Sequence, residues 1–152
     1  MFVAIATTPA GARVLMPVCQ ALSAPLWLPG KVVSTIDLPP HLTVETYHGS
    51  LKSIVEQLWI SQAGLIFALA TGAVVRLIAP LLQDKTVDPA VVAICESGRF
   101  VFCLCGGHQG GGDRLTHQIS QLLDATPVVT GAADHRQLSG IDVLGEPFGW
   151  QR

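Results

Sequence analysis

Charged residues are scarce in this chain of 152 residues. Asp, Glu, Lys and Arg together make up 13% of it, the formal net charge is −2, and the sequence contains no run of basic residues. Proteins that bind nucleic acids usually carry a basic patch or stripe, so this composition argues against a nucleic-acid partner. Hydrophobic residues reach 49%. Such a share is typical of strands covered on both faces, and it also fits surface hidden against another domain.

Long hydrophobic runs are absent as well. The longest nearly apolar stretch, residues 64–75, is interrupted by Thr71 and stopped by Arg76, which makes it too short to span a bilayer. The N-terminal residues, Met-Phe-Val-Ala-Ile-Ala, lack the positive flank of a signal peptide and are typical of a strand instead. We therefore expect a cytoplasmic protein with no membrane partner.

Cysteines are few, and their spacing does not suggest a zinc site. The chain has four, Cys19, Cys95, Cys103 and Cys105, and no pair has the separation of zinc ligands. All four lie in apolar runs, which favours buried free thiols over a redox or metal role. We expect no metal ligands from this chain.

What the chain does contain is an alternation of apolar runs and helical patterns. Strands are expected at residues 2–6, 32–33, 42–47, 64–70, 90–95, 100–104 and 127–130, and helices at residues 9–22, 51–60, 72–82 and 115–123. Residues 96–99 predict a tight hairpin turn. This order predicts an α/β fold with three layers, in which a mostly parallel sheet has helices on both faces (Rossmann-like) and includes a short β-hairpin. We expect residues 1–146 to form one domain and residues 147–152 to begin a linker to a C-terminal region.

Three strand exits combine small residues with polar side chains. They are residues 70–72, with Thr71 as the expected helix cap, residues 106–113 and residues 130–134. If the sheet is parallel at these places, the three exits line one edge, where ligands of such folds bind. The candidate substrate-binding residues are Thr71, Gly72, Arg76, Gly107, Gly110, Gly111, Gly112, Asp113, Thr130 and Asp134. Plainer alternatives stay open: Arg76 is merely solvated, Asp113 is a helix-start carboxylate, and Asp134 caps a turn.

The second exit is the most unusual, because five of the residues from Gly106 to Gly112 are glycines. Glycine allows the backbone to approach a ligand closely, and the following helix begins with unpaired N–H groups. His108 lies inside this run, where it is a general acid or base, a ligand to a metal in the substrate, or a plain hydrogen-bonding residue. The run lacks the placement of a dinucleotide-binding fingerprint and the Lys of a phosphate-binding loop, so nucleotide binding is a minority hypothesis.

Two segments together resemble the N-terminal domain of the cobalamin-biosynthesis protein CbiG. They are residues 66–92, which contain Ala-Thr-Gly-Ala-Val-Val-Arg, and residues 98–115, which contain Gly-His-Gln-Gly-Gly-Gly-Asp and are followed by residues 127–134. The order and spacing match over about half of the chain. The chain departs from this family at Gly106, where serine is usual, and at Asp113, where asparagine is common.

This resemblance implies the activity of a cobalt-precorrin-5A hydrolase in the oxygen-independent route to vitamin B12. Water opens the δ-lactone of a cobalt tetrapyrrole, and acetaldehyde leaves to give cobalt-precorrin-5B. Cobalt then enters with the substrate, so no cofactor is expected. With such chemistry, His108 is the candidate base and the N–H groups of Gly110–Gly112 are candidate oxyanion donors.

The resemblance also implies partners, and the sequence leaves other functions open. A C-terminal CbiG domain is expected, and in some members a fused precorrin methyltransferase. The main alternative is a corrinoid-binding domain without chemistry of its own inside a larger fused protein. Nucleotide binding comes third.

Overall fold

The computed structural model describes residues 1–61, 64–107 and 110–131. The strands are β1 (Phe2–Ala6), β2 (Leu26–Pro29), β3 (Val44–Tyr47), β4 (Gly64–Ala68), β5 (Ala90–Ile94), β6 (Phe100–Cys105) and β7 (Thr126–Val128). The helices are α1 (Pro9–Leu22), α2 (Gly30–Val33), α3 (Leu51–Ser61), α4 (Thr71–Ile78) and α5 (Gly112–Leu123), with a 3₁₀ turn, η1 (Ala79–Leu81), directly after α4.

The strands form one seven-stranded sheet in the order β3-β2-β1-β4-β5-β6-β7. The strands from β3 to β5 are all parallel, β6 is antiparallel to β5, and β7 is parallel to β6. The order of the first five strands is the one found in the first part of the Rossmann fold. The predicted α/β fold, with a mostly parallel sheet and one hairpin, is therefore confirmed.

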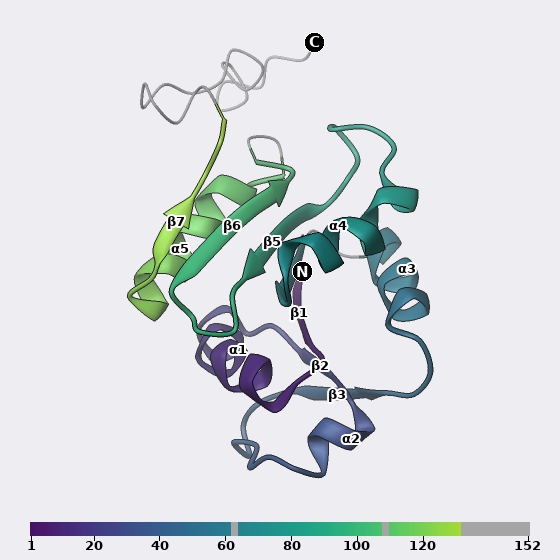
Figure 1. Ribbon diagram of the computed structural model, residues 1–152, viewed down its shortest axis with the longest axis vertical. Coiled ribbons are helices and arrows are strands. Elements are labelled where there is room, and N and C mark those ends of the chain that lie inside the picture. Colours follow the sequence, from purple (N-terminus) through teal and green to yellow (C-terminus); the bar gives the residue numbers. More distant parts are fainter. Residues whose placement is uncertain (62–63, 108–109, 132–152) are drawn as a thin grey trace.

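Strand β1 shows why both faces of the sheet need a cover. Its residues Ala4 and Ala6 belong to a core under α1 and α5, whereas Val3 and Ile5 belong to a core under α3 and α4. Successive side chains of a strand point to opposite faces, so a central strand without polar residues must be buried on both. Figure 1 shows α5 behind β6 and β7, and α3 and α4 on the opposite side of the sheet. This arrangement accounts for much of the apolar composition.

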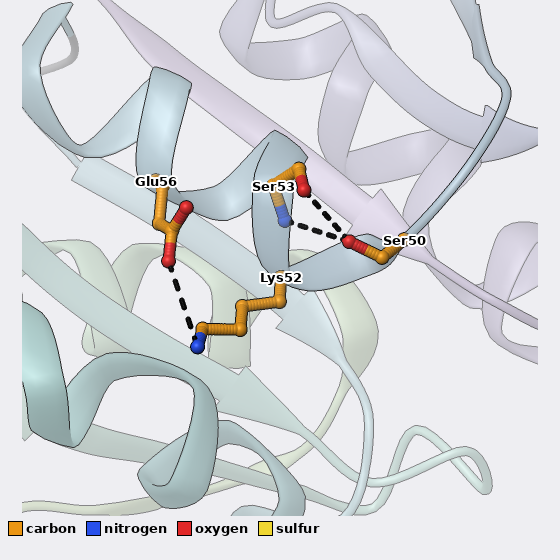
Figure 2. Close-up of polar contacts among 4 residues, drawn as sticks. All are labelled: Ser50, Lys52, Ser53 and Glu56. Carbon is orange, nitrogen blue, oxygen red and sulfur yellow. Dashed lines mark hydrogen bonds and ion pairs between the residues drawn. The ribbon is translucent and has the colours of Figure 1, made fainter.

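Two helices begin at hydroxyl caps. Thr8 precedes α1, and its Oγ1 accepts a hydrogen bond from the amide of Gly11 at 3.0 Å. Ser50 does the same for α3, because its Oγ accepts from the amide of Ser53 at 3.1 Å (Figure 2). Further along α3, Lys52 and Glu56 form an exposed ion pair at 3.9 Å. Capping thus explains where these helices start.

The second strand lies where the sequence pattern was misleading. Residues 32–33 were expected to be a strand, but they end the short helix α2, and the strand is Leu26–Pro29. The prolines at 25 and 29 look like breakers in the sequence. They flank or end the strand, where a missing N–H is tolerated, and the carbonyl of Pro25 accepts a bond from Ala4 at 3.0 Å. No helix within the described ranges is long and apolar enough to cross a membrane.

Candidate functional site

The hairpin between β5 and β6 separates the expected strand exits onto two edges of the sheet. Because β6 runs against β5, Cys105 at the end of β6 pairs with Val91 at the start of β5. We call the edge where β5 begins and where β6 and β7 end the amino edge, and the opposite one the carboxyl edge. Residues 106–107 and 110–113 and Thr130 lie at the amino edge. Residues 70–72 follow the end of β4 and lie at the carboxyl edge. The expectation that all three exits share one edge is therefore wrong, since the sheet is not parallel at β6.

The amino edge contains a pocket with a volume of about 260 Å³. It is lined by Cys103, Leu104, Cys105, Gly106, Gly107, Asp113, Thr130 and Gly131. The structure thus brings together three predicted site residues, Gly107, Asp113 and Thr130. Gly110, Gly111 and Gly112 lie in the same loop and helix start. His108 and Asp134 lie outside the described residues.

We call the described part of the segment between β6 and α5 the glycine corner (residues 106–107 and 110–112), and its residues Gly106 and Gly110 lie close to the start of β5. Gly106 has a φ of +67°, and a Cβ placed on it would lie 2.8 Å from the Cα of Ala90. Both the left-handed conformation and the close approach require glycine at this position. The glycines here therefore have a structural role beside any role in binding.

Two of the amides at the start of α5 are already hydrogen-bonded. Gly112 N–H donates to the carbonyl of Gly106 at 2.9 Å, and Asp113 N–H donates to the carbonyl of Gly107 at 3.1 Å. The expectation that the amides of Gly110–Gly112 serve together as oxyanion donors is therefore wrong for Gly112. The loop's own carbonyls satisfy part of the donor capacity that a helix start usually offers to an anion.

Asp113 places a half-buried carboxylate in the pocket, at the first turn of α5. A Cβ on Gly107 would lie 2.7 Å from Asp113 Oδ1 and 2.9 Å from Oδ2, so the carboxylate rests on the backbone of Gly107. The helix dipole favours a negative charge at this position. The pocket therefore repels free carboxylates and accepts neutral or hydrogen-bond-donating groups.

The pocket thiols are protonated at neutral pH. Burial, and after it the hydrogen bond and charge of Asp113, raises the pKa of Cys103 to about 12. Burial and the charge of Asp88 raise the pKa of Cys105. A thiol held in its neutral form is a weak nucleophile and a weak metal ligand. In the described residues, no group of three or more His, Cys, Asp or Glu side chains is placed to hold a metal ion.

The carboxyl edge holds the remaining predicted residues. Thr71 is the first residue of α4 and Ala70 takes the cap position, so the expected cap at Thr71 is wrong by one residue. Arg76 Nη1 donates to the carbonyl of Gly72 at 2.9 Å, which holds the exposed guanidinium along its own helix. The Oγ1 of Thr8 also donates to the carboxylate of Glu96, just after β5. These contacts stabilise helix starts, and they lie apart from the pocket.

Sequence reasoning missed three of the residues in the pocket wall. Cys103, Leu104 and Cys105 were read only as a buried strand, yet they line the pocket. The signal that could have shown the change of edge was the predicted turn at residues 96–99. A tight turn reverses the chain, so the exit of the returning strand must lie beside the start of its partner.

Comparison with known proteins bears on this site. The family described as cobalamin synthesis G N-terminal matches residues 53–134, a range that includes the whole pocket lining. A protein of Priestia megaterium named cobalt-precorrin-5A hydrolase is 41% identical over 107 residues, which are 70% of this chain and 29% of that protein. A protein of Salmonella typhimurium with the same name is 42% identical over 98 residues, 64% of this chain and 28% of that protein.

A solved structure shows the same fold. The crystal structure of a cobalamin biosynthesis protein G homolog from Sulfolobus solfataricus superposes with a TM-score of 0.62 and 20% sequence identity, covering 85% of this chain and 36% of that one. By comparison, the chain spans less than a third of the length of each of the two hydrolases from Priestia megaterium and Salmonella typhimurium. Because the family match extends over more than half of its residues, the chain belongs to the cobalamin synthesis G N-terminal family.

Proposed function

We propose that this chain supplies the substrate-binding N-terminal part of a cobalt-precorrin-5A hydrolase. One observation carries the proposal: every residue that lines the amino-edge pocket lies within the segment that matches the family. Relatives named for this activity are 41% and 42% identical to this chain over 107 and 98 residues. In the proposed reaction, water opens the lactone of a cobalt tetrapyrrole and acetaldehyde is released.

The charge of the pocket favours the lactone over the other groups of such a substrate. A tetrapyrrole of this pathway carries several peripheral carboxylates, which the side chain of Asp113 disfavours in the pocket. The lactone is neutral, and the exposed hydroxyl of Thr130 at the pocket is a suitable donor for its carbonyl oxygen. We therefore assign the pocket to the lactone and not to a free carboxylate.

Lactone opening requires a base for the attacking water and donors for the tetrahedral oxyanion. We propose His108 as the base, because it directly follows the pocket residue Gly107 in the chain. The candidate donors are the amides of Gly110 and Gly111 and the hydroxyl of Thr130, since the amide of Gly112 already donates to Gly106. Thr71, Gly72 and Arg76 lie at the other edge of the sheet, so we do not assign them to lactone binding.

The chain spans only 29% of the first relative, so other parts of the protein belong to the proposal too. We propose that the hydrolase includes a C-terminal CbiG domain, with a precorrin methyltransferase as a further fused partner, and that it works in the cytoplasm. A complete hydrolase then needs this chain together with the C-terminal domain.

Release of acetaldehyde tests the proposal. The purified full-length protein, with this chain and the C-terminal domain, is incubated with enzymatically prepared cobalt-precorrin-5A, and acetaldehyde is measured through NADH consumption by alcohol dehydrogenase. We expect release by the wild type and a loss of about a hundredfold in H108A, the usual size of a base contribution. H117A is the matched control, because His117 lies on the exposed side of α5. Unchanged turnover in H108A removes His108 from the mechanism.

A second function that the sequence leaves open is that of a corrinoid-binding domain without chemistry of its own. The two functions differ in one measurement. A binding domain shifts the absorption spectrum of cobalt-precorrin-5A but releases no acetaldehyde, whereas a hydrolase does both.

A further inference from the structure

The loop between α4 and β5, residues 82–89, exposes apolar side chains. Val87 is 68% exposed and Leu82 is 45% exposed. Isolated apolar residues are common on protein surfaces. Leu82 and Val87 differ from such isolated residues in two ways. Hydrogen bonds fix the loop that carries them, and the loop lies beside the pocket.

Hydrogen bonds give the loop a defined shape. Oδ1 of Asp84 accepts from the amide and the hydroxyl of Thr86, at 2.8 and 2.5 Å. Both carboxylate oxygens of Asp88 accept from the amide of Gln83 at 3.1 Å. The carbonyl of Asp84 accepts from the amides of Val87 and Asp88 at 3.1 and 2.9 Å. Val87 thus lies in a turn whose amides at residues 83, 86, 87 and 88 are hydrogen-bonded, which lowers the entropy lost when a ligand binds to it.

This loop stands beside the pocket. It ends at Pro89, and a Cβ on Gly106 of the glycine corner would lie 3.2 Å from the Pro89 carbonyl oxygen. Asp88 lies close enough to Cys105, which lines the pocket, for its charge to raise the pKa of that thiol after the larger effect of burial. The loop and the end of β6 therefore occupy the same edge of the sheet (Figure 1).

The size of the pocket requires a second contact surface. Pockets that bury a drug-sized ligand measure about 300 to 1,000 Å³, whereas this one measures about 260 Å³. It holds one substituent of a tetrapyrrole and leaves the ring outside. The ring is flat and apolar, so it needs an apolar surface next to the pocket mouth.

We propose that Leu82 and Val87 form an apolar rim that holds the flat face of the tetrapyrrole while its lactone occupies the pocket. This inference rests on the proposed function and adds a specificity surface to it. The other occupants of such a surface, a second copy of the chain or a further domain of the protein, give different outcomes in the test.

The test compares L82S/V87S with V75S. Val75 is a matched control, because it is 49% exposed but lies on α4, outside the loop. Cobalt-precorrin-5A is titrated into the purified protein and its absorption spectrum gives the Kd. We expect the Kd of L82S/V87S to rise about tenfold, because two partly buried apolar side chains lose their contact, and that of V75S to stay unchanged. Circular dichroism and thermal unfolding check that the variants fold.

Several results would overturn the rim. An unchanged Kd in L82S/V87S excludes contact with the ring, and an equal loss in V75S shows a general surface effect. If the Kd stays constant while sedimentation shows a smaller assembly, the rim is an interface between copies. These outcomes leave the proposed function intact, provided that the wild type binds cobalt-precorrin-5A. A wild type that does not bind it refutes both.

Discussion

Asp113 and Gly107 are held together by two contacts in the glycine corner. The amide of Asp113 donates to the carbonyl of Gly107 at 3.1 Å, and a Cβ on Gly107 would lie 2.7 Å from Asp113 Oδ1. The carboxylate that gives the pocket its charge is therefore placed by a residue without a side chain.

The first prediction concerns G107A. The added methyl group meets the end of a side chain and not backbone, so the Asp113 carboxylate moves and the fold survives. We expect a change of less than about 1 kcal/mol in the free energy of unfolding, measured with urea, and about tenfold weaker binding of cobalt-precorrin-5A. In a D113A background the same methyl group should have no further effect. Equal binding losses from G107A in both backgrounds would contradict this account.

Gly106 and Gly111 form a matched pair for a second prediction. Both have positive φ, +67° and +74°, but a Cβ on Gly106 would lie 2.8 Å from the Cα of Ala90, while one on Gly111 meets nothing within 4 Å. G111A should cost about 1 to 2 kcal/mol from backbone strain alone. G106A should cost about 1 to 3 kcal/mol more, because backbone of β5 must also move. Urea unfolding measures both, and equal costs would show that the contact with β5 is unimportant.

Thr8 supports a third prediction, at the carboxyl edge. Its Oγ1 accepts from the amide of Gly11 and donates to the carboxylate of Glu96. T8A should lower the free energy of unfolding by about 1 kcal/mol, the usual cost of losing a helix cap. T8S keeps the hydroxyl and should recover most of the loss, whereas E96Q keeps the cap and should change little. A T8S variant as unstable as T8A would show that the methyl group of Thr8 matters more than its hydroxyl.

The fourth prediction is a loss of stability at high pH. Burial raises the pKa of Cys19 from 9.0 to about 12. Between these two values the unfolded chain releases the thiol proton and the folded chain keeps it, so stability falls as the pH rises. The contribution is about 1.4 kcal/mol per pH unit above 9. C19A should therefore show a shallower decline between pH 9 and 10.5 in urea unfolding, and parallel curves for variant and wild type would refute it.

Much of the fold could be predicted from short patterns in the sequence. The expected strands at residues 2–6, 90–95 and 100–104 and the helix at residues 9–22 lie within a residue of the observed ones. The strand Leu26–Pro29 could not be predicted in this way, because its prolines suppress the local signal and its place is set by pairing with β1 and β3. The glycine corner was recognised as a site, but its wall of Cys103–Cys105 was not.

By itself, the sequence determined most of the segments that become strands and helices, the burial of the central strands on both faces, and the place of the glycine corner. These properties depend on side-chain periodicity and on the backbone freedom of glycine, both of which are local. Only the tertiary structure decided that Thr71 and Asp113 lie at opposite edges of the sheet, and that the amide of Gly112 donates a hydrogen bond to the carbonyl of Gly106. Strand direction and hydrogen-bond partners depend on which distant segments pair, and the antiparallel pairing of β6 with β5 moved the glycine corner away from the ends of β1 and β4.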